Sequence, residues 1–188
     1  ITDIPVTVKI RLGWDNNHIN FLEVIKGLQE ANVDAIGIHA RTTKELYSGL
    51  PHYELIKNLR LKMKVPLIVS GNIFTLDDAI NALEITKADA VMVARGGVGN
   101  PNLITQINHY FKTGERLPDK DLETQKQYCL ELAKGFKEEY GEEAGMRIFR
   151  SIAPKFFQGF PNSKELRTNL VQKLDSLETL EKILNDYN

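Results

Sequence analysis

The sequence predicts an α/β fold, in which a parallel sheet built from βαβ units precedes a segment that is helical only. Two observations support this class. Four short apolar runs begin at residues 6, 35, 66 and 90, and a helical pattern lies between each run and the next. After a linker rich in Gly, Pro and charge, "TGERLPDKD", only helical patterns follow. We therefore expect two parts, residues 1–114 and residues 115–188.

The predicted strands are the four apolar runs, "VTVKIR" (6–11), "AIGIHAR" (35–41), "PLIVSGN" (66–72) and "AVMVAR" (90–95). Apolar residues at positions i, i+3 and i+4 predict helices over the intervening segments, residues 20–32, 52–64 and 76–87. Thr75 is the expected N-cap of the third helix, because its hydroxyl can accept a hydrogen bond from the first turn and acidic residues follow it. Strand, helix and strand at this spacing indicate parallel pairing.

The remaining elements are predicted to be helices. One runs from Pro101 to about Lys112, and a long amphipathic helix covers "LETQKQYCLELAKGFKEEYG". The next pattern is expected to break at Pro154, since proline removes a helical hydrogen bond. One or two helices follow, with Asn162 or Ser163 as the cap.

Composition excludes several classes of protein. The chain has 24 basic and 25 acidic side chains, so its net charge of -1 favours neither nucleic acid nor a membrane surface. Its single cysteine, Cys129, cannot form an internal disulfide and is expected to be packed in a helix. There is no apolar run of about 18 residues, no secretory signal and no metal-ligand spacing. These features predict a soluble, cytoplasmic protein.

Polar residues close each predicted strand, where parallel α/β folds gather their ligands. They are Lys9 and Arg11, His39 and Arg41, Ser70, Gly71 and Asn72, and finally Arg95 and Gly96. In "ARGGVGNPN" the glycines, the following helix and Arg95 could together bind a phosphate. The alternative is a tight turn that needs glycine. The second glycine turn, "VSGNI", favours phosphate, because (β/α)8 barrels use their last two loops in this way.

Lys9 and His39 each have two interpretations. A strand lysine is commonly an edge or snorkelling residue, but the place of Lys9 at the strand end beside Arg11 favours a cation that neutralises an electron-rich ring or a phosphate. His39 could be a satisfied core histidine. Its position before Arg41 favours a ligand-binding residue.

The helical part carries a basic segment. Between residues 146 and 173, Glu165 is the single acid among the basic residues Arg147, Arg150, Lys155, Lys164, Arg167 and Lys173. A charge run is often only a solvated face, yet this excess is the best candidate for a surface that binds a polyanion.

Five segments resemble the bacterial tRNA-dihydrouridine synthases, flavoenzymes that reduce uridines in tRNA: "PVTVKIRLGWD", "AIGIHARTTKELYSGLPHYELI", "VPLIVSGNIFTLDDA", "ADAVMVARGGVGNPNLI" and "GMRIFRSIAPKFFQGFPNSKELR". The resemblance implies FMN contacts from Lys9, His39, Gly71, Asn72, Arg95 and Gly96, and a uridine near Arg11 and Arg41. It also implies tRNA binding by the helical residues Arg147, Arg150, Lys155, Lys164 and Arg167. The family usually has Asn-Gly-Asp at Ser70-Gly71-Asn72, and Gly-Arg at Ala94-Arg95.

The resemblance further implies that this chain is the second half of a TIM barrel, strands five to eight, followed by an all-α tRNA-binding domain. NADPH would reduce the flavin, which would pass a hydride to C6 of a flipped uracil. The cysteine that protonates C5 belongs to a preceding segment of the family, and Cys129 does not match it. The chain alone is therefore expected to be inactive, with open barrel edges that favour self-association.

Two other interpretations of the sequence remain open. The chain could be a tRNA-binding module without catalysis. It could also be another phosphate-binding barrel, an aldolase or a dihydroorotate-type dehydrogenase, although these would not explain the basic helical segment.

Overall fold

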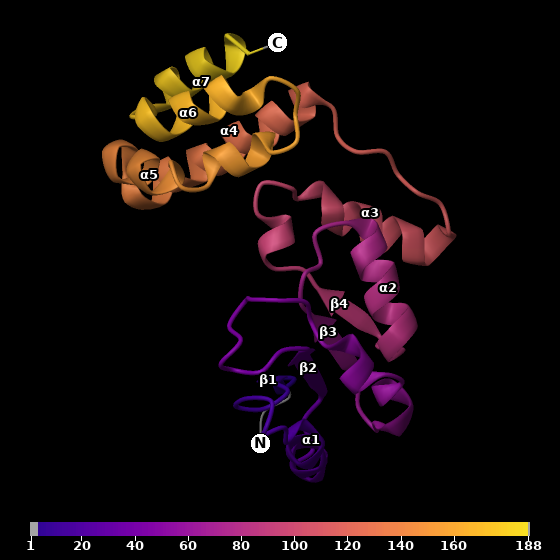
Figure 1. The fold of residues 1–188 in the computed structure, drawn as a ribbon. Coiled ribbons are helices and arrows are strands. Elements are labelled where there is room, and N and C mark those ends of the chain that lie inside the picture. The colour runs from indigo at the N-terminus through magenta and orange to yellow at the C-terminus, as the bar shows by residue number, and fades with distance from the viewer. Residues whose placement is uncertain (1–3, 188) are drawn as a thin grey trace. The chain divides into compact units, whose positions relative to one another are not determined.

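The computed structural model describes residues 4–187. Its sheet has four parallel strands in the order β1-β2-β3-β4 (Figure 1). The strands are β1 (Thr7–Arg11), β2 (Ala35–His39), β3 (Leu67–Ser70) and β4 (Ala90–Met92). All four predicted strands are confirmed, and so is their parallel pairing. β2, β3 and β4 end before the last residues of the predicted runs, which therefore lie in the loops beyond the sheet.

Two helices of the first part match their predicted positions. They are α1 (Phe21–Glu30) and α2 (Leu76–Thr86). Thr75 caps α2 as expected: its hydroxyl accepts from the backbone N–H of Asp78 at 3.1 Å, and the Asp78 carboxylate accepts from the backbone N–H of Thr75 at 2.9 Å. This reciprocal capping box satisfies amide groups that the first helical turn leaves free.

The helix predicted over residues 52–64 is wrong. Two short 3₁₀ helices occupy this segment instead, η1 (Tyr53–Ile56) and η2 (Leu59–Lys62). Asn58 lies between them in the left-handed region, with φ 54°, and so interrupts the helical path. The apolar spacing is still used, because Tyr53, Ile56, Leu59 and Met63 are all buried.

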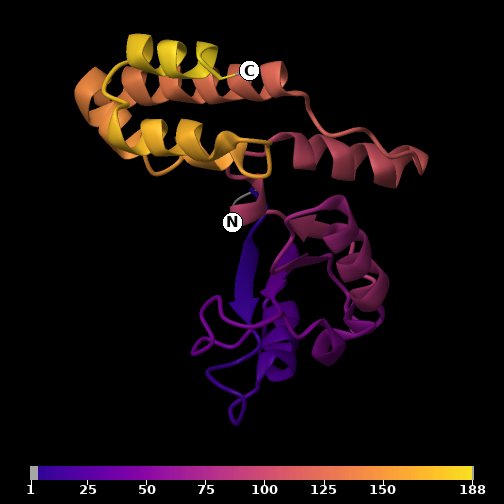
Figure 2. The ribbon, with the colours of Figure 1, turned by 45° about the horizontal axis from the view of Figure 1, so that its top comes forward.

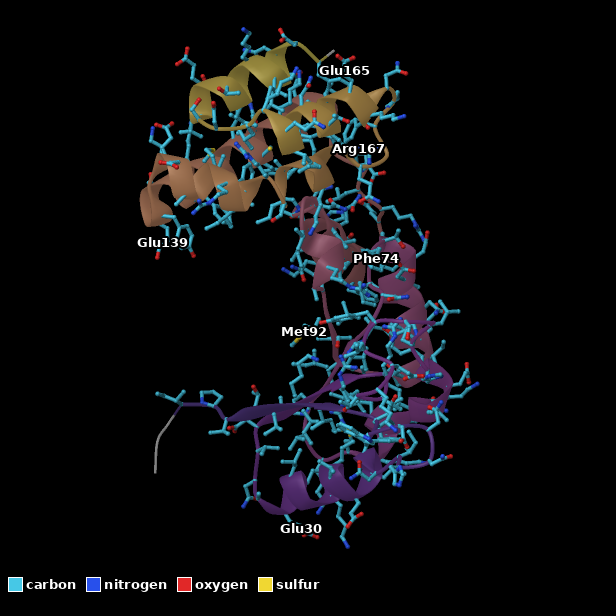
Figure 3. The ribbon with its side chains drawn as sticks, turned by 60° about the vertical axis from the view of Figure 1, so that its left-hand side comes forward. Glu30, Phe74, Met92, Glu139, Glu165 and Arg167 are labelled. Carbon is cyan, nitrogen blue, oxygen red and sulfur yellow. The ribbon has the colours of Figure 1, made fainter. Side chains whose placement is uncertain are left out.

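The two faces of the sheet differ in their burial. Ile36, Ile38, Leu67 and Val69 point to one face and are fully buried. On the other face β1 and β4 leave Thr7, Lys9, Ala90 and Met92 exposed. Met92 projects from β4 in Figure 3. Parallel sheets are normally covered on both faces, so this face is a surface that a closed fold would bury.

Seven helices follow β4 in the described part of the chain, and no strand does. They are η3 (Arg95–Gly97), α3 (Asn102–Thr113), α4 (Leu122–Tyr140), α5 (Glu142–Phe149), η4 (Ala153–Phe157), α6 (Ser163–Gln172) and α7 (Leu177–Asn185). Figure 2 shows α4, α6 and α7 beside one another, and α4 packs on both α5 and α7. Their shared core contains Cys129, Met146, Phe149 and Phe157. The packed cysteine and the break at Pro154 agree with the sequence analysis.

The chain divides into two compact units, residues 1–96 and 97–188. This boundary comes earlier than the linker after residue 114, so α3 belongs to the second unit. The reason is local: the Gln106 side chain donates to the carbonyls of Leu117 and Pro118, each at 3.3 Å, and ties α3 to the linker. At the start of α6, Asn162 is the N-cap residue but makes no side-chain capping bond.

Candidate functional site

A cavity of about 250 Å³ lies at the carboxyl ends of the four strands, within the first unit. Parallel pairing explains the convergence, because Arg11 stands opposite His39, and His39 stands opposite Ser70. Seven of the eight site residues predicted in this unit line the cavity: Lys9, Arg11, His39, Gly71, Asn72, Arg95 and Gly96. Arg41 is the exception.

Arg41 lies in the protein interior and is fully buried. Its Nε donates to the carbonyl of Ser48 at 3.1 Å, and Nη2 donates to the carbonyl of Gly49 at 2.6 Å. Its Nη1 lies 3.2 Å from Nε2 of His39. Arg41 therefore organises the loop that follows β2, and the structure places it behind the cavity wall.

Asn72 joins two arginines at the turn after β3. Its Oδ1 accepts from Arg41 Nη2 at 3.1 Å and from Arg95 Nη2 at 3.2 Å. The turn needs unusual backbone, with φ of 131° at Gly71 and 49° at Asn72. Glycine and asparagine adopt such values more easily than other residues. Asn72 thus supplies a neutral acceptor where an aspartate would supply a charge.

Sequence reasoning missed Tyr47, Phe74 and Met92 among the cavity residues. The Arg95 guanidinium lies 4.5 Å from the Tyr47 ring centroid and 5.4 Å from that of Phe74. Arg11 approaches Tyr47 from elsewhere in the cavity wall, at 5.9 Å. These are cation–π distances. Figure 3 labels Phe74 and Met92. The aromatic residue in the polar loop "RTTKELYSGL" was the available signal for Tyr47.

The cavity is strongly cationic. Within residues 4–187, no carboxylate forms an ion pair with Lys9, Arg11, Arg41 or Arg95. Burial, with a contribution from Arg11, lowers the pKa of Lys9. Burial and the surrounding cations, Arg11 foremost, lower the pKa of His39 to about 4. A ligand with negative charge would relieve this unpaired field.

The glycines of "ARGGVGN" have structural reasons of their own. A Cβ on Gly96 would lie 1.9 Å from the Ile73 carbonyl oxygen, so the turn after β3 can approach only a glycine there. Gly99 has φ 78° and contacts the backbone of Lys155 and Phe156. The helix that starts at Arg95 is only the short η3, and α3 begins at Asn102. The helix predicted from Pro101 to about Lys112 is therefore confirmed as α3, and it follows the glycine run, while the Arg95 side chain lines the cavity ahead of it.

The five basic residues that the resemblance assigns to tRNA binding fall into two groups. Arg147, Lys155 and Lys164 are exposed, on α5, η4 and α6 respectively. Arg150 and Arg167 are half-buried (Figure 3 labels Arg167). Arg150 donates to the Leu174 carbonyl at 2.6 Å, and Arg167 to the Ser163 carbonyl at 3.4 Å. A polyanion in solution could reach the three exposed side chains, whereas the Arg150 side chain is held by its hydrogen bond to the Leu174 carbonyl.

Comparison with known proteins decides the family. A model of "Dihydrouridine synthase (Dus)" matches residues 1–187. A probable tRNA-dihydrouridine synthase of Rickettsia bellii is 39% identical over 184 residues, which cover 98% of this chain and 56% of that protein. tRNA-dihydrouridine synthase B of Pseudomonas aeruginosa is 34% identical over 176 residues, 93% of this chain and 53% of that protein. The chain belongs to the dihydrouridine synthase family.

The chain spans about half the length of the curated relatives that it matches. Membership of the dihydrouridine synthase family confirms the resemblance seen in the sequence. It disfavours the aldolase and dihydroorotate-type interpretations. None of the described helices is both long and apolar enough to cross a membrane, and the described residues contain no cluster of three or more metal-ligating side chains.

Proposed function

We propose that the chain is the flavin- and tRNA-binding part of an FMN-dependent tRNA-dihydrouridine synthase, which reduces uridine to 5,6-dihydrouridine with NADPH as the reductant. The observation that carries this proposal is the cavity at the strand ends, where three cations, Lys9, Arg11 and Arg95, line the wall and form no ion pair with a carboxylate of residues 4–187. A tRNA substrate would make the cytoplasm the place of action.

The proposed architecture is strands five to eight of a (β/α)8 barrel. The strand order supports it, because each strand pairs with the next along the chain, as in a barrel, while doubly wound sheets reverse their order. The exposed face of β1 and β4 supports it as well, since that face would line the barrel interior.

The residues present fit FMN. Arg95 would hold the phosphate, with Gly96 allowing the close approach of the turn, and Lys9 and His39 would contact the ring system, with Gly71 and Asn72 shaping the wall. When bound, FMN accepts a hydride from NADPH and donates one to the uracil. The chain's own residues bind and orient: Lys9 supplies a positive charge at the ring, and Arg11 and Tyr47 lie where a uracil would enter. We propose that Arg41 acts on this entry through the loop that it holds.

The proton for C5 must come from outside these 188 residues in this proposal. The one cysteine of the chain is Cys129, in the core of the second unit, and burial raises its pKa to about 12. Such a thiol is a poor proton donor and cannot reach a substrate. We therefore propose that the chain alone binds its ligands without turnover.

Flavin binding by the purified chain tests the first half of the proposal. FMN fluorescence should be quenched on titration, and the variants Lys9→Met and Arg95→Met should each weaken binding at least tenfold. The reason is that a charge-assisted hydrogen bond contributes about 1.5–3 kcal/mol. Lys62→Met, at an exposed position of η2, is the control for loss of one positive charge. Equal affinity in all four proteins would refute the assignment of this cavity.

Binding of tRNA tests the second half. We expect affinity to fall with salt, and the triple variant Arg147→Met, Lys155→Met, Lys164→Met to bind more weakly. Its salt slope should be shallower by about one for each phosphate that the variant no longer neutralises. A triple variant of Lys26, Lys62 and Lys64, all exposed in the first unit, is the matched control. Binding of tRNA by a chain that never binds flavin would favour the binding-module interpretation.

A further inference from the structure

His39 and Arg41 form a buried pair that determines where the imidazole carries its proton. Arg41 Nη1 lies 3.2 Å from His39 Nε2. A guanidinium nitrogen can only donate, so Nε2 must be the acceptor and must keep its lone pair. The proton of the neutral ring therefore sits on Nδ1.

The other ring nitrogen faces no protein partner. Among the described residues, Nδ1 of His39 forms no hydrogen bond. The one fully buried side-chain polar atom without a partner in the described part of the chain is Oδ1 of Asn102, in the second unit. Since Nδ1 of His39 also has no partner, it cannot be fully buried and must be accessible. His39 lines the cavity at the strand ends, so its Nδ1–H can donate to a ligand there.

Arg41 cannot easily turn away from His39. Its guanidinium is held on its remaining nitrogens by the Ser48 and Gly49 carbonyls and by Oδ1 of Asn72. The groups that face His39 also oppose a second proton on its ring. They are Lys9 and Arg11 from β1, Arg41 itself and Arg95 from η3, while β3 presents only the neutral Ser70.

We propose that Arg41 is a positioning residue that fixes His39 as the neutral Nδ1–H tautomer, so that His39 donates a hydrogen bond to an acceptor atom of the ligand in the cavity. The identity of that ligand, a phosphorylated flavin, rests on the proposed function. The tautomer does not, because it is a property of the chain itself.

Nitrogen NMR of the uniformly ¹⁵N-labelled chain tests the tautomer directly. The sequence has four histidines, and His39→Asn identifies the signals of interest by their loss. We expect a protonated Nδ1 and an unprotonated Nε2 in the wild-type chain at neutral pH. In Arg41→Met the ring should move toward the Nε2–H form that predominates in free histidine, with a higher pKa. Arg41→Lys should lie between the two.

Arg60→Met is the control, because Arg60 also has structural bonds, to the Met63 carbonyl at 3.1 Å and to the Asp89 carboxylate, but does not contact His39. It should leave the His39 signals unchanged. A protonated Nε2 in the wild-type chain would overturn the proposal, even if Arg41→Met does not fold. An unchanged tautomer in a folded Arg41→Met chain would overturn it too.

Titration with FMN separates this inference from the proposed function. We expect Arg41→Met to bind FMN at least tenfold more weakly, as the loss of one oriented donor implies, and Arg60→Met to bind it normally. If the ring is Nδ1–H but the chain binds no FMN, the proposed ligand is wrong and the role of Arg41 stands. If the chain binds FMN but the ring is Nε2–H, the role of Arg41 is wrong and the proposed ligand stands.

Discussion

At the scale of single residues, the low pKa of His39 couples the cavity to the stability of the first unit. The folded chain keeps this ring neutral down to about pH 4, whereas an unfolded chain protonates it near pH 6.5. Between these values the unfolded state binds more protons, so stability falls as the pH falls. Above pH 6.5 the ring is neutral in both states and makes no such contribution.

We therefore expect the free energy of unfolding to drop between pH 6.5 and pH 5 by about 1.4 kcal/mol per pH unit at most. Urea unfolding followed through Trp14, the single tryptophan and a residue of the first unit, measures it. His39→Asn should flatten this part of the profile. The low pKa of Glu45, about 2, acts below pH 4.5 and so outside this window. An equally steep profile in His39→Asn would contradict the assignment.

Residue identities at the site were largely predictable from the sequence. Lys9 and His39 lie at or near the ends of parallel strands and Arg95 follows shortly after β4, and such a position specifies the edge of the sheet at which a side chain lies. Arg41 was not predictable in the same way. Its partners are carbonyls in the loop after β2 and Asn72 beyond β3, and this long-range closure leaves no periodic signal in the sequence.

At the scale of elements, the cap of α2 supports the cavity wall. The Asp78 carboxylate accepts from the backbone N–H groups of Thr75 and Phe74, at 2.9 and 3.0 Å, and Phe74 lines the cavity. We expect Thr75→Ala to destabilise the first unit by about 1 kcal/mol, since the hydroxyl that caps the helix is lost. Urea unfolding measures this cost. Thr75→Ser, which keeps the hydroxyl, should stay near wild type, and equal losses in both variants would show that the methyl group matters instead.

Helix boundaries followed the sequence where a cap or a proline marked them, as at Thr75 and Pro154. The segment 52–64 did not, because its apolar spacing suits a continuous helix as well as two 3₁₀ turns. Asn58 decided between them through its positive φ, a backbone choice that asparagine tolerates but does not require. The polar residues around Asn58, and not the apolar periodicity, were the weak sequence signal for this break.

At the scale of the whole molecule, the division between the units depends on contacts that composition does not show. The linker after residue 114 is the clearest break in the sequence, yet the compact units separate at residues 96 and 97. Gly99 explains part of this early boundary. Its carbonyl accepts from Gln125 of α4, and a side chain at Gly99 would clash with the backbone of Lys155. The turn after β4 therefore packs within the second, helical unit.

The exposed sheet face gives the last expectation. β1 and β4 each have one unpaired edge, and Ala90 and Met92 are exposed on the open face. Parallel sheets bury both faces, and open edges invite pairing, so two copies of the chain should associate through this surface if the half-barrel proposal is right. Sedimentation velocity at micromolar concentrations should show dimers, and Ala90→Lys should shift them to monomers, because burying the added charge is costly.

Asn81→Lys, at an exposed position of α2, adds the same charge away from the open face and is the control for this experiment. It should associate like the wild type. A chain that stays monomeric throughout would count against association through the open face, and equal behaviour of the two lysine variants would place the contact elsewhere. A dimer that Ala90→Lys abolishes while Asn81→Lys does not would locate the interface on the face that carries Lys9, and hence beside the proposed flavin site.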